Sequence, residues 1–195
     1  MDFTGDINKL IKIILEMKSE KCIIIGPSGS GKDFLLRRLS EKGLKSCLKW
    51  TTRPKRKFEE QGSTYNFVDD SEFLQSINEN KFLTYQEFEV TPEDSDPERW
   101  YYGITTDDFE LSQVLIMTPG EFDDVSEKQR KSCFVVYLDI DRKVRESRLH
   151  TREDKNDSIK RRLDSDEIDF QNLSDYDLRI TDPEFNADDV YGLMY

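Results

Sequence analysis

The stretch KCIIIGPSGSGK, residues 21–32, decides the fold. Its first half is a short apolar run that ends at a glycine, which is typical of a strand buried in a parallel sheet. Its second half, from Gly26 to Lys32, matches the phosphate-binding loop G-x-x-x-x-G-K. Glycines in such a loop let backbone N–H groups turn toward an anion, and the lysine reaches the β- and γ-phosphates. The alternative is a glycine-rich turn with a surface lysine, but a strand before and a helix after favour the loop.

The residue after the lysine departs from this motif. The motif ends in Ser or Thr, whose hydroxyl binds Mg²⁺, whereas this chain has Asp33. A carboxylate can bind a hard cation directly or through water. Equally, Asp33 can be an acid in the first turn of the helix, stabilised by the helix dipole. The residues predicted to bind the donor phosphates are Gly26, Ser28, Gly29, Ser30, Gly31, Lys32 and Asp33, with Asp33 also the candidate metal ligand.

Strands and helices alternate along much of the chain. Residues 7–17 and 33–43 have helical spacing, and the apolar runs 114–117 and 134–138 are each followed by a polar, helix-like stretch. This order predicts an α/β core around a mainly parallel sheet. Between residues 53 and 105, aromatic residues in short alternating runs predict a small β-rich insertion. We therefore expect a P-loop core of residues 1–52 and 106–195, with a lid at about 150–162, and an insertion of residues 53–105.

The composition narrows the possible partners. The chain has 195 residues, with 29 basic and 41 acidic side chains, and a net charge of −12. That charge argues against a nucleic-acid or anionic-membrane partner, because both would repel it. However, 20 of the 29 basic side chains lie in residues 21–57 and 142–162. We expect these two regions to face the phosphates of small-molecule nucleotides.

The three cysteines and the single histidine fit no zinc site, and the apolar stretch at residues 10–15 is too short and polar for a signal peptide or membrane span. We interpret the cysteines as reduced, intracellular and mostly buried thiols. We expect the protein to be cytoplasmic, to make no contact with a membrane, and to be a monomer or homodimer.

Three further motifs follow the loop in order: TTRPKR at residues 51–56, YNFV at 65–68 and YYG at 101–103. With them, the chain from about Lys21 onward resembles the guanylate kinase family. The resemblance implies a nucleoside monophosphate kinase with a P-loop core, an inserted monophosphate-binding domain and a mobile lid, and with ATP and Mg²⁺ as its requirements. It also implies that the acceptor monophosphate is bound by Arg53, Arg56, Tyr65 and Tyr102.

A second basic region resembles the lid of that family. The segment RLHTR, residues 148–152, is followed by SIKRRL, residues 158–163. By this resemblance Arg148, Arg152 and Arg162 clamp the ATP phosphates and the transferring group, and they form the catalytic set together with Lys32. Arginine suits the task because its planar fork binds phosphate bidentately and stays charged.

Several positions that read the guanine base in the family differ here. The family's glutamate aligns with Thr84, and the Ser or Thr after the YYG motif is Ile104, with Thr105 next to it. The acids of the family's Asp-x-Asp strand end are replaced by residues 116–118, Ile-Met-Thr, and Lys49-Trp50 replaces small hydroxyl residues. These departures leave GMP open as the acceptor and indicate a different base site. The residues expected near the base are Trp50, Thr84, Ile104, Thr105 and Thr118.

Two functions from different classes remain. The leading hypothesis is an enzyme that transfers the ATP γ-phosphate to GMP, dGMP or another nucleoside or deoxynucleoside monophosphate. The alternative is a catalytically inactive guanylate-kinase-like domain that binds a phosphorylated peptide or protein. The missing strand-end acids favour the alternative, whereas the retained Lys32 and lid arginines oppose it. A P-loop GTPase is less well supported because the chain has no Asn-Lys-x-Asp motif.

Overall fold

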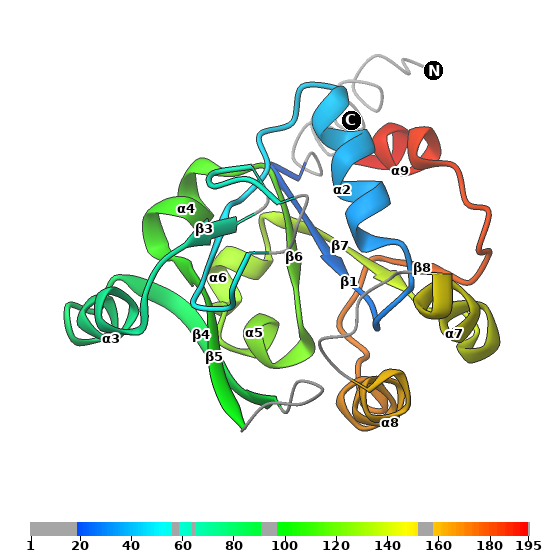
Figure 1. Cartoon of the computed structure of the whole chain (residues 1–195). Coiled ribbons are helices and arrows are strands. Elements are labelled where there is room, and N and C mark those ends of the chain that lie inside the picture. Colours follow the sequence, from blue (N-terminus) through cyan, green and yellow to red (C-terminus); the bar gives the residue numbers. More distant parts are fainter. Residues whose placement is uncertain (1–18, 56–58, 64, 91–96, 152–157, 195) are drawn as a thin grey trace, which may run out of the picture.

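The computed structural model describes residues 19–55, 59–63, 65–90, 97–151 and 158–194. Its described part contains a parallel sheet and a second, mostly antiparallel sheet, with helices around both (Figure 1). The predicted α/β core around a parallel sheet is confirmed. The helix expected at residues 7–17 lies outside the described residues.

The parallel sheet has the strand order β6-β1-β7-β8. Its strands are β1 (Lys21–Ile25), β6 (Val114–Met117), β7 (Cys133–Leu138) and β8 (Leu178–Ile180). Both neighbours of β1 run parallel to it. This central position places the loop that follows β1 at the carboxyl edge of the sheet, where ligands of open α/β sheets bind.

Both faces of β1 are covered, which explains its unbroken apolar sequence. Cys22 and Ile24 belong to a core with helices α2 (Lys32–Glu41) and α9 (Ala187–Met194). Ile23 and Ile25 belong to a second core on the opposite face, with α4 (Thr106–Leu111) and α5 (Pro119–Asp123). Four of the five residues of β1 are fully excluded from solvent. Such two-sided burial is typical of parallel sheets.

The remaining helices around the parallel sheet are short or lie at its margin. α6 (Glu127–Arg130) precedes β7, whereas α7 (Arg142–Thr151) and α8 (Ile159–Phe170) lie between β7 and β8 in the chain. In Figure 1, α7 and α8 lie on the right, on the side away from the second sheet. Within the described residues, no helix has the length and apolar composition needed to cross a bilayer.

The second sheet has the strand order β3-β2-β5-β4. It consists of β2 (Lys49–Thr51), β3 (Tyr65–Phe67), β4 (Phe82–Val90) and β5 (Glu98–Thr105), with α3 (Asp70–Asn78) against it. β2 is parallel to β3, whereas β5 is antiparallel to both β2 and β4. Because β2 pairs within this sheet, the sheet begins four residues before the boundary expected at residue 53.

The structure explains why the third residue of the YYG motif, Gly103, is a glycine. A Cβ atom at this position would lie 2.7 Å from the Phe82 ring and 3.1 Å from the Phe73 ring. These two rings stack at 4.4 Å between their centroids. Glycine is therefore required because the aromatic core between α3 and the second sheet packs directly on the backbone of β5.

Candidate functional site

The loop from Gly26 to Lys32 joins β1 to α2. Gly29 and Gly31 have φ angles of +79° and +104°, in the left-handed region that glycine adopts without steric cost. Gly31 is the N-cap of α2, so the first N–H groups of the helix face the loop. The Ser30 hydroxyl is buried and has no hydrogen-bond partner among the described residues. The loop therefore presents N–H and O–H donors together with a helix N-terminus, the arrangement that binds phosphate.

Lys32 folds back along this loop. Its ammonium donates hydrogen bonds to the carbonyl oxygens of Gly26 and Pro27, at 3.0 Å for Pro27. Burial lowers the pKa of Lys32 to about 8, although the charges of Asp33 and Asp166 oppose the shift. The Lys32 ammonium is therefore bound by two neutral carbonyl oxygens. A negatively charged phosphate would be a stronger partner and could replace them.

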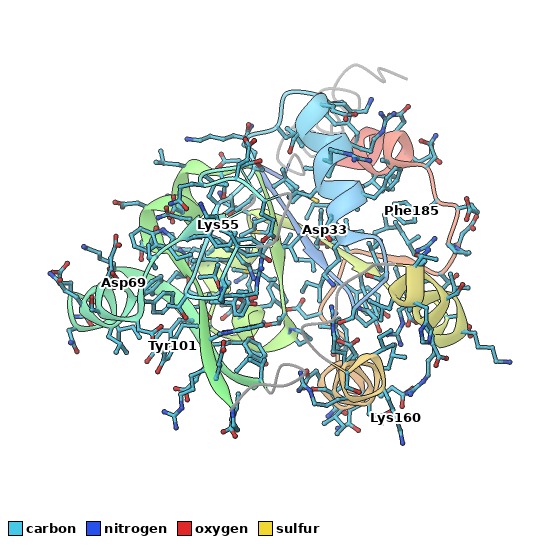
Figure 2. All side chains as sticks on the ribbon, viewed as in Figure 1. Asp33, Lys55, Asp69, Tyr101, Lys160 and Phe185 are labelled. Carbon is cyan, nitrogen blue, oxygen red and sulfur yellow. The ribbon has the colours of Figure 1, made fainter. Side chains whose placement is uncertain are left out.

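A cavity of about 250 Å³ brings the predicted phosphate-binding groups together. It lies between the loop, the second sheet and α8. In Figure 2, Asp33 lies at α2 near the centre of the view, and Lys160 marks α8 below it. The predicted site residues that line this cavity are Ser28, Gly29, Gly31, Lys32, Asp33, Arg53, Tyr65, Tyr102 and Arg162.

Arg53 is the buried cation on the acceptor side of the cavity. Its side chain is only 2% exposed, and its Nη2 donates to both oxygens of Glu59, at 2.8 and 2.9 Å. The guanidinium lies 5.5 Å from the centre of the Tyr65 ring, and Tyr65 contacts Tyr102 edge to face. Burial lowers the pKa of Arg53, but the hydrogen bond to Glu59 and the nearby charges of Glu59, Tyr102 and Tyr65 together outweigh burial, so the pKa is raised overall. Arg53 thus remains charged while buried.

The arginines expected in the lid occupy different positions. Arg148 on α7 donates to the carbonyl oxygen of Pro183 at 2.7 Å and also lies 3.4 Å from the carbonyl oxygens of Gly29 and Ser30. Arg162 on α8 lines the cavity. Arg56 and Arg152, together with the rest of the expected lid at 152–157, lie outside the described residues.

Two of the positions expected near the base form polar contacts between β4 and α5. Thr84 is buried and donates to Asp124 Oδ2 at 2.7 Å. Thr118 donates to Gln86 Oε1 at 3.0 Å, and its hydroxyl caps the N-terminus of α5. These contacts join the second sheet to the helix that follows β6.

The other three have packing or capping contacts. Ile104 is fully buried in the core on the α4 side of the parallel sheet. Thr105 accepts the Asp108 N–H and caps α4. The Trp50 indole donates to Asp108 at 3.0 Å and contacts Phe82 edge to face. None of these three lines the cavity.

Sequence reasoning did not identify two buried ion pairs beside the cavity. Lys49 in β2 pairs with Glu121 in α5, and Arg145 in α7 pairs with Asp166 in α8. Asp166 also accepts the Ser28 N–H at 2.9 Å, so it joins α8 to the phosphate loop. The available signal for the first pair was Lys49 itself, a charged residue just before the TTRPKR motif, where the family resemblance leads us to expect a small hydroxyl residue.

No group of three or more His, Cys, Asp or Glu side chains in the described ranges could hold a metal ion. Asp33 is an acid that lines the cavity beside Lys32. The three cysteines are free and buried, as expected. Burial raises the pKa of Cys22 to about 12 and the pKa values of Cys47 and Cys133 to about 11.

Comparison with known proteins gives a consistent result. A family model described as guanylate kinase matches residues 18–92. A guanylate kinase from Prochlorococcus marinus is 30% identical over 173 residues, which cover 83% of this chain and 90% of the relative. A guanylate kinase from a Nostoc species is 30% identical over 175 residues, covering 85% and 83%.

The fold is similar to that of a solved protein as well. The crystal structure of guanylate kinase from Anaplasma phagocytophilum matches 91% of this chain and 85% of its own, with a TM-score of 0.63 and 19% sequence identity. At that identity the match supports the fold, a P-loop core with a second sheet.

Proposed function

This chain belongs to the guanylate kinase family, and from that premise we propose that it transfers the γ-phosphoryl group of ATP to a nucleoside or deoxynucleoside monophosphate. The products are ADP and the corresponding nucleoside diphosphate. Family membership supports a nucleoside monophosphate kinase. The activity of this chain and its acceptor, whether GMP, dGMP or another monophosphate, belong to the proposal.

The observation that carries the proposal is the shared cavity. It is lined on one side by the phosphate loop and on another by Arg53, Tyr65 and Tyr102, with Arg162 on α8. Phosphoryl transfer requires two phosphate-bearing substrates held in line and positive charge around the transferred oxygens. In this proposal the donor phosphates bind along the loop and the acceptor phosphate binds near Arg53, with Lys32 and Arg162 as further cations lining the same cavity.

The proposed roles rest on the contacts of the described residues and, for Arg56 and Arg152, on the family resemblance alone. The loop donors and Lys32 hold the ATP phosphates, with the buried Ser30 hydroxyl as one donor. Arg53, Arg56, Tyr65 and Tyr102 hold the acceptor phosphate, and Arg53 exchanges the Glu59 carboxylate for it. Arg148, Arg152 and Arg162 neutralise charge that develops on the transferred group. No side-chain nucleophile is needed, because an oxygen of the acceptor phosphate attacks.

Asp33 fits a magnesium requirement as a single carboxylate. Mg²⁺ bound with nucleotides usually keeps several waters and takes one or two carboxylates together with substrate phosphates. Asp33 lines the cavity beside Lys32, so it is the described carboxylate that would hold such an ion. When bound, the ion would neutralise charge on the phosphate oxygens.

We further propose that small-molecule nucleotides are the partners and that the protein acts in the cytoplasm as a monomer or homodimer. The net charge of −12 supports nucleotides over nucleic acid. In the proposed division, residues 53–105 form the monophosphate-binding insertion and the remainder forms the core.

A coupled assay of ADP release across the ribo- and deoxynucleoside monophosphates tests the proposal. The wild-type chain is expected to phosphorylate at least one acceptor in an ATP- and Mg²⁺-dependent reaction. Lys32→Ala serves as the inactive control. If no acceptor raises the rate above that of Lys32→Ala, the kinase proposal is wrong.

One observation favours a second function, a domain that binds a phosphorylated peptide or protein without catalysis. The end of β6 carries Ile116, Met117 and Thr118 in place of acids, and Thr118 is already bonded to Gln86. Calorimetry separates the two functions. Binding of a phosphopeptide without ATP binding would support the binding domain, whereas ATP binding with phosphoryl transfer supports the kinase.

A further inference from the structure

A carboxylate from α8 lies on the phosphate loop. Asp166 Oδ2 accepts the Ser28 N–H at 2.9 Å, and Asp166 Oδ1 accepts the Ser28 hydroxyl at 3.4 Å. Ser28 belongs to the loop and lines the cavity. Backbone N–H groups of such a loop are the donors that bind phosphate oxygens. Asp166 therefore takes up a donor that the proposed function assigns to ATP.

Asp166 lies among cations as well as N–H donors. Arg145 Nη1 lies 3.4 Å from Asp166 Oδ2 and 3.4 Å from the Ser28 carbonyl oxygen. Arg145 Nε also donates to the Ile140 carbonyl oxygen at 2.9 Å, which fixes the guanidinium. Burial lowers the pKa of Lys32, and the charge of Asp166 is among the influences that raise it. The carboxylate thus lies among the kinds of group that bind phosphate.

The contact is largely shielded from solvent. The side chain of Asp166 is 14% exposed and that of Arg145 is 6% exposed. Water and salt therefore weaken the attraction between these groups much less than they weaken a surface ion pair. An anion that enters the loop must compete with a contact that is already formed inside the protein.

The place of Asp166 on α8 relates it to Arg162. The two residues are four positions apart on the helix, so they lie on the same face. Arg162 lines the cavity, whereas Asp166 contacts the loop. α8 therefore directs one acid and one base toward the phosphate site. The acid excludes a phosphate oxygen from Ser28, and the base attracts one.

Charge decides which anion keeps the Ser28 N–H. A carboxylate and a phosphate oxygen cannot both accept this hydrogen bond, and the two anions repel each other at short distance. Binding of a polyphosphate along the loop therefore requires that the contact between Asp166 and Ser28 break. The free energy needed to break it is subtracted from the affinity for the polyphosphate.

We propose that Asp166 is an autoinhibitory carboxylate, an internal anion on Ser28 that the ATP phosphates displace when they bind. This inference rests on the proposed binding of ATP at the loop. Before displacement, α8 is attached to the loop through its acid, and ATP affinity is reduced. After displacement, Asp166 stays paired with Arg145, and Arg162 is the charged group of α8 that faces the phosphates.

Calorimetric titration with ATP and Mg²⁺ tests the inference. Asp166→Asn keeps the size of the side chain and one oxygen acceptor but removes the charge. Because hydrogen bonds to charged groups are the stronger ones, this variant should bind ATP about three- to tenfold more tightly than the wild-type chain. Inorganic triphosphate, which carries no base or sugar, should show the same gain. Damage to the fold would weaken binding instead.

Asp164→Asn is the matched control. Asp164 also lies on α8, where it pairs with Arg142 at 2.7 Å, and its side chain is 50% exposed. This variant changes the net charge by the same amount without touching the loop. Its ATP affinity should stay within about twofold of the wild-type value, because solvent and salt screen an exposed charge. An equal gain in both variants would assign the effect to net charge and contradict the inference.

Asp166→Asn weakens the partner of the buried Arg145, so the fold needs a separate control. The double variant Arg145→Met/Asp166→Leu removes both charges, and such replacement of a buried ion pair by apolar side chains is often neutral for stability. It should unfold at about the wild-type temperature and should also bind ATP more tightly. A folded double variant with wild-type or weaker ATP affinity would overturn the inference.

The outcomes separate this inference from the kinase proposal. The titrations need binding and not turnover, so they remain decisive if no acceptor is phosphorylated and the kinase proposal fails. In an active enzyme, Asp166→Asn should lower the KM of ATP and leave the KM of the acceptor unchanged. Equal or weaker binding of ATP and triphosphate by folded Asp166→Asn would overturn the autoinhibitory role while leaving an active kinase intact. If neither anion binds to the wild-type chain or to Asp166→Asn, both proposals are wrong.

Discussion

At the scale of single residues, Lys32 connects burial with ligand binding. Burial brings the pKa of Lys32 down to about 8, so its folded-state ammonium loses its proton as the pH rises through 8. Phosphate binding requires the charged form. We therefore expect the ATP association constant to be nearly level below pH 7 and to fall about tenfold between pH 7 and pH 9, as one-proton linkage predicts.

Isothermal titration calorimetry at a series of pH values measures this dependence. Lys32→Arg is the matched control, because its guanidinium stays charged throughout this range. Any ATP affinity that this variant retains should not depend on pH between 7 and 9. A wild-type affinity that is equally constant would show that Lys32 is not the group that titrates.

Gly29 is constrained by both its backbone conformation and a close contact, whereas Gly43 is constrained by its backbone conformation alone. Both have positive φ angles, but a Cβ on Gly29 would lie 2.8 Å from the Arg145 carbonyl oxygen, whereas a Cβ on Gly43 would meet nothing within 4 Å. Gly43→Ala should therefore lower the free energy of unfolding by about 1–2 kcal/mol through backbone strain alone. Gly29→Ala should cost clearly more and weaken ATP binding. Equal losses in urea denaturation would mean that the contact with α7 is unimportant.

At the scale of elements, Asp166 fixes α8 against both α7 and the phosphate loop. Its carboxylate accepts the Ser28 N–H and pairs with Arg145, whose side chain is 6% exposed. Asp166→Ala leaves Arg145 buried without its acid, so we expect the free energy of unfolding to fall by about 3 kcal/mol.

Asp164→Ala is the control for that substitution, because Asp164 lies two residues earlier on α8 and is exposed. Asp164 pairs with Arg142 at the surface, where ion pairs contribute little. Chemical denaturation of the two variants should give a clear loss for Asp166→Ala and little change for Asp164→Ala. Similar values for both would contradict a specific role of Asp166 in holding α8.

The elements also show what the sequence could predict. The apolar runs at β1, β6 and β7 and the glycine loop depend on local pattern, and they predicted the parallel sheet and the loop correctly. Ile104 packs in the core and Thr105 caps α4 because β5 ends at this point. The alignment of these two residues with a family motif did not reveal where the strand ends. Lys49 and Glu121 are separated by 72 residues, and only the packing of α5 beside β2 brings them together.

At the scale of the whole molecule, the fold encloses all three thiols. Cys22, Cys47 and Cys133 are buried, and their pKa values are raised to about 11 or 12. Because the thiolate is the reactive form, a thiol reagent at pH 8 should react with the native protein far more slowly than with the denatured protein. All three thiols per chain should react with the reagent only after the protein is denatured. Rapid reaction of one thiol in the native state would show that its surroundings open readily.

The central claim is the transfer of phosphate between two bound nucleotides. ATP labelled on its γ-phosphate, incubated with the chain, Mg²⁺ and a nucleoside monophosphate, measures it most directly. We predict that the label appears in the nucleoside diphosphate with wild-type protein and not with Lys32→Ala. Label found only in inorganic phosphate, or remaining entirely in ATP for every acceptor, would contradict the account.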